Sequence, residues 1–263
     1  MKPLPSPQAT SRTQRPGHSL VPILSLLAVG TLLAASCRTA WRLRRSAELA
    51  RLSVPIQQRP SHPSTRLLIV GDSTGVGTGA SAPEHSLAGW LAQMQPSLWL
   101  ENRACDGAGF RDLPAQLDAG LADAPPFDLV LILAGANDVV RLRSVRDLRR
   151  DIEHVLRRAG ALAAQVIVMP AGNVGHAPLF FAPLSWLMSW RARILHREIR
   201  AAAARHRAVY VNLFKPRSRD PFVQHPHLLS ADQLHPSDAG YATWFGELMA
   251  QAPDLAQRLK SAP

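Results

Sequence analysis

Three residues in this sequence could together perform nucleophilic chemistry. Ser73 follows the apolar run 67–70 and the dipeptide Gly71-Asp72, and Asp232 lies three residues before His235. In one helix-like turn the Asp232 carboxylate can accept a hydrogen bond from the His235 imidazole and fix its tautomer. The other ring nitrogen can then take the proton of a serine hydroxyl, which is a weak nucleophile until a base removes that proton. These residues predict a nucleophilic role for Ser73.

The stretch after Ser73 also allows a second interpretation, in which glycines cradle a phosphate. The order in residues 75–79 is Gly-x-Gly-x-Gly, and Glu101 ends the next predicted strand, which partly imitates the dinucleotide-binding fingerprint. The fingerprint requires Gly-x-Gly-x-x-Gly, and the chain has no Gly-Lys-Ser/Thr for a P-loop. Nucleotide binding also leaves Asn137 and the Asp-His pair without a role, so it is the weaker interpretation.

Strand and helix patterns alternate after residue 64 and determine where these residues lie. Short apolar runs predict buried strands, and runs with apolar residues on one face predict helices. The predicted strands are 67–70, 98–100, 128–133, 166–169 and 209–213. The predicted helices are 86–94, 113–121, 142–159, 186–206 and a last one from Ser237 or Asp238 to about 249. This alternation predicts an α/β fold in which helices cover both faces of a five-stranded parallel sheet.

Three loops follow predicted strands at the carboxyl edge of that sheet, where open α/β sheets bind ligands. They are 71–79, 103–109 and 135–138, and all are rich in glycine or small polar residues. The segment 230–236 comes late in the chain and carries the Asp-His pair. We expect these four segments to meet.

Four short blocks in these segments resemble the sequence blocks of the SGNH (GDSL-type) hydrolase family. They are Gly71-Asp72-Ser73, the run from Asn102 to Gly107, the run 135–138 around Asn137, and Asp232-Gln-Leu-His235-Pro. The blocks stand in the family's order, and the resemblance covers residues 66–250, essentially the whole domain. One departure is Thr74, which takes the place of the Leu in the family's name.

The resemblance implies a role for each matching residue. Ser73 would be the nucleophile, His235 the general base and then acid, and Asp232 the group that orients His235. The backbone N–H groups of Ser73 and Gly107 and the side-chain amide of Asn137 would form the oxyanion hole. Acyl transfer needs such donors, because negative charge develops on the carbonyl oxygen.

Each residue also has a structural alternative. Ser73 could cap the following helix, and Asn137 could be a turn residue. Asp72 and Asp138 are predicted to hold loops through backbone N–H groups and not to be catalytic. His225 and His227 lie near Asp232, but no complete set of metal ligands is present, so we predict a Pro-rich surface loop there and no metal site.

The basic charge of the chain is concentrated near its N-terminus. Residues 1–60 hold nine Lys and Arg against one acid, whereas residues 61–263 hold 21 against 18. The formal charge of +11 therefore does not indicate a nucleic-acid partner. The two cysteines, Cys37 and Cys105, lie in different segments and predict no disulfide framework.

An uncharged segment separates a basic lead from the domain. Residues 1–18 are predicted to be disordered, and the 19 residues of 19–37 approach the ~20 that cross a bilayer, so we predict a transmembrane or signal-anchor segment. Flanking charges conflict over the side of the membrane, and cleavage or lipidation at Cys37 stays open. Residues 38–63 are predicted to be a basic juxtamembrane linker, with a possible amphipathic helix at 41–52. Residues 64–255 form the predicted hydrolase domain, and 256–263 a tail.

Residues 179–190 form the most apolar aromatic stretch of the domain, and could line an acyl pocket, touch the membrane or pack in the core.

Altogether the sequence predicts a flavodoxin-like α/β/α sandwich carrying a serine esterase without cofactor. Its substrate would be a carboxylic ester of a lipid, acetyl or other acyl group, and transfer to an acceptor other than water stays open. The alternative is a membrane-tethered, non-catalytic ligand-binding domain on the same scaffold. No oligomeric state is indicated.

Overall fold

The computed structural model describes residues 21–119 and 126–261, with the side chains of the first helix described from Ser36 onward. Residues Trp41–Pro263 form one compact unit. Its centre is a parallel sheet of five strands in the order β2-β1-β3-β4-β5. The strands are β1 (Thr65–Gly71), β2 (Leu98–Asn102), β3 (Phe127–Leu133), β4 (Ala163–Val168) and β5 (Val209–Tyr210). The prediction of an α/β fold with a five-stranded parallel sheet is confirmed.

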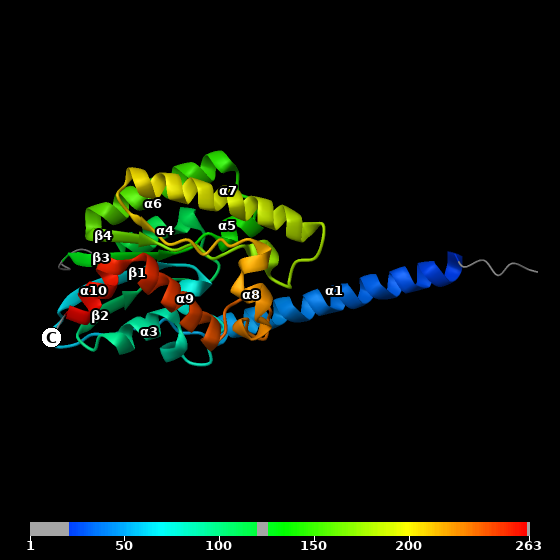
Figure 1. Ribbon diagram of the computed structural model, residues 1–263, viewed down its shortest axis with the longest axis horizontal. Coiled ribbons are helices and arrows are strands. Elements are labelled where there is room, and N and C mark those ends of the chain that lie inside the picture. Colours follow the sequence, from blue (N-terminus) through cyan, green and yellow to red (C-terminus); the bar gives the residue numbers. More distant parts are fainter. Residues whose placement is uncertain (1–20, 120–125, 262–263) are drawn as a thin grey trace, which may run out of the picture. The chain divides into compact units, whose positions relative to one another are not determined.

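Helices cover both faces of the sheet (Figure 1). One face carries α4 (Leu113–Asp118), α5 (Ala136–Val140), α6 (Val145–Leu162) and α7 (Leu184–Arg205), and the other carries α3 (Leu87–Met94), α9 (Asp238–Gln251) and α10 (Pro253–Ser261). Side chains alternate along a strand, so Leu68 and Val70 of β1 pack in the first core while Leu67 and Ile69 pack in the second. This double burial explains why the strand sequence is continuously apolar.

The strand order determines where a ligand can bind. β1 pairs with β2 on one side and with β3 on the other. The connections therefore leave β1 and β3 in opposite directions, which opens a crevice beyond their carboxyl ends. The same strand order is found in flavodoxin-like folds.

Several predicted boundaries differ from the observed ones, and two of these differences have a clear physical cause. The helix predicted over 142–159 begins at Val145, because Leu142 has φ of 51° and the Ser144 side chain caps the helix. The predicted tail 256–263 forms most of α10, and Leu255 and Leu259 are buried in the second core. Their spacing of four residues places both side chains on one helix face.

The N-terminal part of the described chain is the helix α1 (Val21–Leu52). It covers 41–52, where the sequence left open an amphipathic helix and a plain linker, so the first part of the predicted linker 38–63 is helical. The predicted membrane segment 19–37 lies outside the described residues, apart from helix backbone from Val21 and the side chains of Ser36 and Cys37. Across the described ranges, no helix has both the length and the apolar content needed to cross a bilayer.

The predicted linker 38–63 makes contact with the sheet. Gln58 forms an antiparallel bridge with Leu100, and its side-chain amide donates to the Leu98 carbonyl at 2.9 Å. This pairing covers part of the exposed edge of β2, which would otherwise present unpaired backbone groups. The linker is therefore partly packed onto the domain.

Candidate active site

Ser73 lies directly beyond the carboxyl end of β1, as the first residue of the short helix α2 (Ser73–Val76). Asp72 is the N-cap of this helix, and its Oδ1 accepts hydrogen bonds from the backbone N–H of Thr74 at 2.9 Å and from the Thr74 hydroxyl at 2.7 Å. The capping role that could have been assigned to Ser73 thus belongs to Asp72. Thr74, the departure from the family's Leu, contributes the second of these hydrogen bonds. The Ser73 hydroxyl is left to contact other groups.

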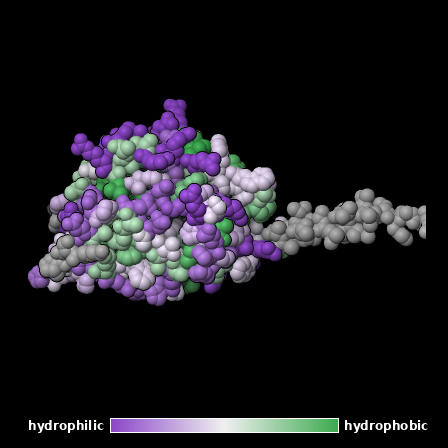
Figure 2. Space-filling model, viewed as in Figure 1, coloured by the Kyte–Doolittle hydropathy of each residue, from purple (hydrophilic) through white to green (hydrophobic). Residues whose placement is uncertain are grey.

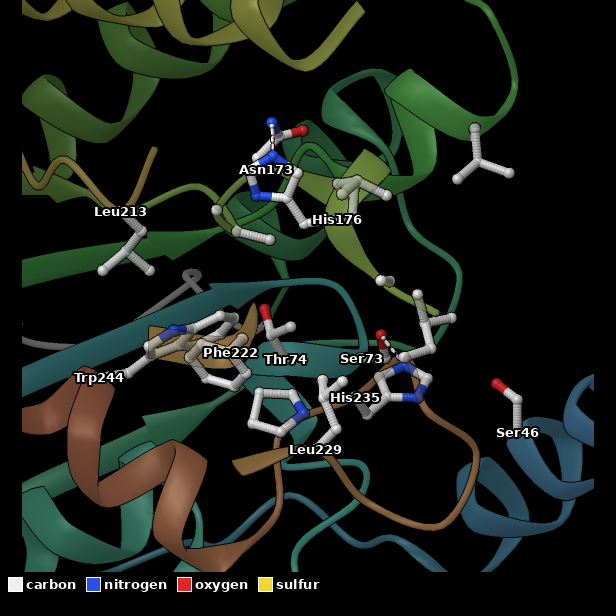
Figure 3. A pocket seen from close by; sticks show the side chains of 18 of the residues that line it. Ser46, Ser73, Thr74, Asn173, His176, Leu213, Phe222, Leu229, His235 and Trp244 are labelled. Carbon is white, nitrogen blue, oxygen red and sulfur yellow. Dashed lines mark hydrogen bonds between the residues drawn. The ribbon is translucent and has the colours of Figure 1, made fainter. Parts of the chain in front are cut away.

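The imidazole of His235 contacts both other members of the predicted triad. Its Nε2 lies 2.9 Å from the Ser73 Oγ, and its Nδ1 lies 2.6 Å from the Asp232 Oδ2. Because an ionised carboxylate only accepts hydrogen bonds, Nδ1 carries the proton and Nε2 is free to accept the serine proton. The structure therefore brings Ser73, His235 and Asp232 into one hydrogen-bonded series (Figure 3 shows Ser73 and His235).

Asp232 is fully buried and held by its own loop. Its Oδ1 accepts hydrogen bonds from the Ser230 hydroxyl and from the backbone N–H groups of Leu234 and His235. Burial by itself raises the pKa of Asp232, but the hydrogen bond from the His235 side chain and these backbone donors outweigh it, so the pKa lies below its ordinary value. Asp232 therefore stays ionised beside the imidazole and favours its Nδ1–H tautomer.

The three predicted oxyanion donors border the same cavity as Ser73. The N–H of Ser73 is at the start of α2, where helix N–H groups lack an intrahelical partner. Gly107 lies in the loop after β2 with φ of 77°, a left-handed conformation that favours glycine. The amide nitrogen of Asn137 donates to the Ala108 carbonyl at 3.1 Å, which leaves its second N–H for a ligand.

The glycines after Ser73 serve packing. Gly77 is the left-handed C-cap of α2. A Cβ at Gly79 would lie 2.5 Å from the Pro236 carbonyl oxygen and 2.9 Å from the His235 Cβ, so only glycine allows the His235 loop to approach. The spacing that imitated a nucleotide fingerprint is thus explained by a helix cap and a close contact.

The two acids predicted to be structural do hold loops. Asp138 accepts a hydrogen bond from the backbone N–H of Phe110 at 3.0 Å, and burial raises its pKa. Burial also raises the pKa of Asp72 to about 6, although the hydrogen bonds from Thr74 offset part of the rise. The second oxygen of Asp72 has no hydrogen-bond partner among the described residues.

A cavity of about 360 Å³ extends from Ser73 (Figure 3). Its walls include apolar side chains from distant parts of the chain, among them Leu43 of α1, Val140 of α5 and Trp244 of α9. Ser46 of α1 also borders it. This contact of α1 with the cavity could not be predicted from the sequence, because neither the spacing nor the composition of the helix specifies a contact.

A second histidine and aspartate pair lines the far wall of the cavity. The Nδ1 of His176 lies 2.7 Å from the Asp220 Oδ2, and its Nε2 lies 2.9 Å from the Asn173 amide nitrogen. The sequence interpretation missed all three residues. One usable signal was present, because Asn173 and His176 follow β4 at the same edge of the sheet.

The aromatic stretch 179–190 does not line this cavity. Leu179 and Met188 are buried in the domain, whereas Phe181, Trp186 and Trp190 are exposed. The interpretation of this stretch as an acyl pocket is therefore wrong. Among the residues that the structure describes, no group of three or more His, Cys, Asp or Glu side chains is arranged to hold a metal ion.

Comparison with known sequences gives a family and a relative. The profile of the GDSL-like Lipase/Acylhydrolase family matches residues 69–243. The chain is 30% identical over 185 residues to a protein named GDSL-like esterase Rv1075c from Mycobacterium tuberculosis, a match that covers 67% of this chain and 58% of that protein. The chain thus spans a little over half the length of this relative.

Solved structures with the same fold include three bacterial or environmental proteins. LAE5, an alpha/beta hydrolase enzyme from the metagenome of Lake Arreo, superposes with a TM-score of 0.58 at 22% identity and covers 74% of this chain and 97% of its own. Axe2, an acetylxylan esterase from Geobacillus stearothermophilus, gives 0.55 at 19% identity over 72% and 94%. A lipolytic protein of the G-D-S-L family from Veillonella parvula gives 0.58 at 15% identity over 72% and 98%. At these identities the likeness concerns the fold alone.

Proposed function

Because the chain belongs to the GDSL-like lipase/acylhydrolase family, we propose that it hydrolyses carboxylic esters with Ser73 as the nucleophile. The observation that carries this proposal is the hydrogen-bonded series from Asp232 through His235 to Ser73 at the wall of a cavity. A relative that is named an esterase supports the same reaction class.

The first half of the proposed reaction forms an acyl-enzyme. The Ser73 Oγ attacks the ester carbonyl carbon while His235 Nε2 takes the hydroxyl proton, and the Asp232 carboxylate stabilises the imidazolium. The carbonyl oxygen becomes an oxyanion within reach of the Ser73 and Gly107 N–H groups and the Asn137 amide. The bond to the leaving alkoxide then breaks, and His235 returns the proton to it, releasing the alcohol.

The second half regenerates the serine. A water molecule loses a proton to His235 Nε2 and attacks the acyl carbon, and the acid leaves as the proton returns to Ser73 Oγ. An alcohol in place of water would give acyl transfer by the same steps. The apolar cavity walls favour an ester with a lipophilic acyl or alcohol group.

A reactive-serine probe tests the proposal on the full chain. We expect labelling by a fluorophosphonate and hydrolysis of p-nitrophenyl esters, both abolished in Ser73→Ala. Ser46→Ala is the matched control, because Ser46 borders the same cavity but is not part of the hydrogen-bonded series. A folded protein that neither reacts with the probe nor hydrolyses any ester would instead support a non-catalytic ligand-binding domain.

We also propose that residues 19–37 attach the protein to a membrane. The support is the sequence alone, which has 19 residues without a charge between basic flanks. Extraction of membranes with alkaline carbonate tests this, because an inserted segment resists extraction. Release of the full chain into the supernatant would refute the attachment.

A further inference from the structure

We propose that the rim of the cavity docks onto a bilayer that contains anionic lipids, and that the enzyme takes a lipophilic ester from that surface. The docking concerns the folded domain and is separate from the proposed N-terminal attachment. Only the substrate part of this inference rests on the proposed esterase function.

Exposed apolar side chains gather around the cavity. Nine of the eleven large apolar side chains that are exposed in the described residues belong to three neighbouring segments, and we call these nine the apolar rim. They are Trp41 and Leu43 of α1, Val140 and Leu142 at the end of α5, and Phe181, Leu184, Trp186, Leu187 and Trp190 at the start of α7. Figure 2 shows pale and green residues at the end of the domain where α7 begins.

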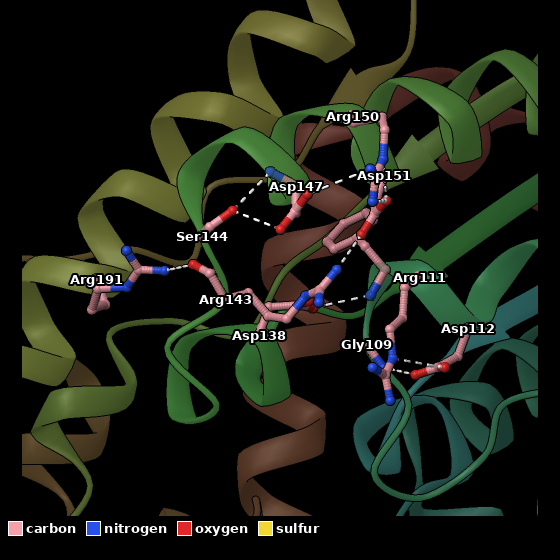
Figure 4. A network of polar contacts seen from close by, with 11 residues as sticks. Gly109, Arg111, Asp112, Asp138, Arg143, Ser144, Asp147, Arg150, Asp151 and Arg191 are labelled. Carbon is pink, nitrogen blue, oxygen red and sulfur yellow. Dashed lines mark hydrogen bonds and ion pairs between the residues drawn. The ribbon is translucent and has the colours of Figure 1, made fainter.

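Hydrogen bonds join the three segments, and two of the segments line the cavity. Leu43 and Val140 line the cavity and are exposed as well, so the apolar rim reaches its mouth from two sides. The Arg42 guanidinium donates a hydrogen bond to the Pro178 carbonyl, which ties α1 to the segment before α7. The Arg191 guanidinium donates to the Arg143 carbonyl, which ties α7 to the loop after α5 (Figure 4). These two hydrogen bonds hold together the three segments of the rim, which are far apart in sequence.

The apolar rim includes three exposed tryptophans, and two of them are on α7. Trp186 is 72% exposed and Trp190 is 55% exposed. Large exposed apolar patches mark interaction surfaces, and tryptophan is enriched where protein meets lipid headgroups. The rim thus has the composition of an interfacial contact.

The charges beside the rim identify the occupant. Arg44, Arg141 and Arg193 are exposed, one on each of the three segments, and none forms an ion pair with a described acid. Residues 178–197 contain three arginines and neither Asp nor Glu. A second copy of this chain would present the same positive charges, which would repel. A surface with many anionic headgroups matches both the arginines and the aromatic side chains.

Quenching by brominated lipid tests the docking directly. The full chain carrying Ser73→Ala is mixed with vesicles of dibrominated phosphatidylcholine and phosphatidylglycerol, because bromine quenches tryptophan only within the bilayer. We expect Trp186→Phe with Trp190→Phe to remove at least about half of the quenched fluorescence. The matched control is Trp90→Phe with Trp99→Phe, which removes fluorescence that the bromine does not quench. Vesicles without phosphatidylglycerol should quench several-fold less.

The same experiment can overturn the docking. Equal loss of quenched fluorescence in the two double variants would do so, because the N-terminal attachment alone would then account for the contact. Self-association of the chain through the rim, without quenching of these two tryptophans, would make a second copy the occupant and also overturn it.

A parallel measurement tests the substrate. In the chain with intact Ser73, Trp186→Ser with Trp190→Ser should leave hydrolysis of soluble p-nitrophenyl acetate unchanged and lower hydrolysis of a long-chain ester embedded in the vesicles by about tenfold. Equal effects on the two esters would refute the delivery of substrate from the bilayer. If the intact chain hydrolyses neither ester, the esterase proposal fails, while the quenching result still decides the docking.

Discussion

Replacing Asn137 by alanine should remove one oxyanion donor and leave the contact between His235 and Ser73 intact. Loss of one such donor lowers kcat by about 10²- to 10³-fold, or about 3 to 4 kcal/mol of transition-state stabilisation. The Asn137 amide also donates to the Ala108 carbonyl at 3.1 Å. Losing that hydrogen bond costs about 1 kcal/mol of folding free energy, which leaves a domain of ordinary stability almost wholly folded. The fall in activity must therefore far exceed what unfolding could explain.

The assay measures kcat and KM on p-nitrophenyl acetate together with the free energy of unfolding in urea. Asn102→Ala is the matched control, because the buried Asn102 amide donates to the Gly75 carbonyl at 2.8 Å and Asn102 is not among the residues that line the cavity. It should lower stability and change kcat by no more than about threefold. A kcat for folded Asn137→Ala within about threefold of the wild type would refute the reasoning. An equal fall in both variants would also refute it, since a general distortion would then explain both.

Three further predictions concern buried titratable groups. Burial raises the pKa of Asp72 to about 6, so its ionisation costs stability, up to about 3 kcal/mol. The stability that goes with a protonated Asp72 is fully present below pH 4 and is lost as the pH rises through about 6. The free energy of unfolding of Asp72→Asn, measured in urea, should not show this pH dependence. Burial lowers the pKa of His196 to about 4, although its hydrogen bond to the Ala171 carbonyl opposes the shift. Stability should therefore fall as pH drops from about 6.5 through 4, and NMR should show a His196 ring that is neutral at pH 6. His176→Ala leaves the buried Asp220 carboxylate without its side-chain partner and should lower the free energy of unfolding by about 1 to 3 kcal/mol. Urea unfolding of the double variant His176→Ala with Asp220→Asn should show a smaller loss.

The strands could be predicted because burial on both faces leaves a direct mark on the sequence. All five predicted strands overlap observed ones, and the core residues of β1 alternate between the two faces. The elements that were missed owe their structure to contacts instead. The helix α10 begins at Pro253 beyond the predicted end of α9, and its short amphipathic pattern becomes stable only when Leu255 and Leu259 pack in the second core.

The candidate triad could be predicted because topology brings loop ends together. Once Ser73 is placed after a central parallel strand, the only additional requirement is that a late segment delivers His235 to the same edge. The pair of His176 and Asp220 is 44 residues apart and follows no motif, so its pairing depends wholly on packing. The stretch 179–190 was ambiguous for a related reason. Its composition suits a pocket wall or a surface contact equally, and only its position at the start of α7 decides.

The loop that carries His235 shows how local and distant information combine. Asp232 accepts hydrogen bonds from the backbone of Leu234 and from both the backbone and the ring of His235, so the loop orients its own imidazole. This part is encoded in four consecutive residues and is recognisable as a motif. The distance from the ring to Ser73 is a different matter, because it requires the loop to pack against the turn after β1. Gly79 permits that approach, since a Cβ there would overlap the Pro236 carbonyl oxygen. Gly79, which resembled a phosphate-binding residue in the sequence, thus allows His235 to reach Ser73. The loop around Asp232 orients the His235 ring, whereas the packing at Gly79 sets the position of that ring beside Ser73.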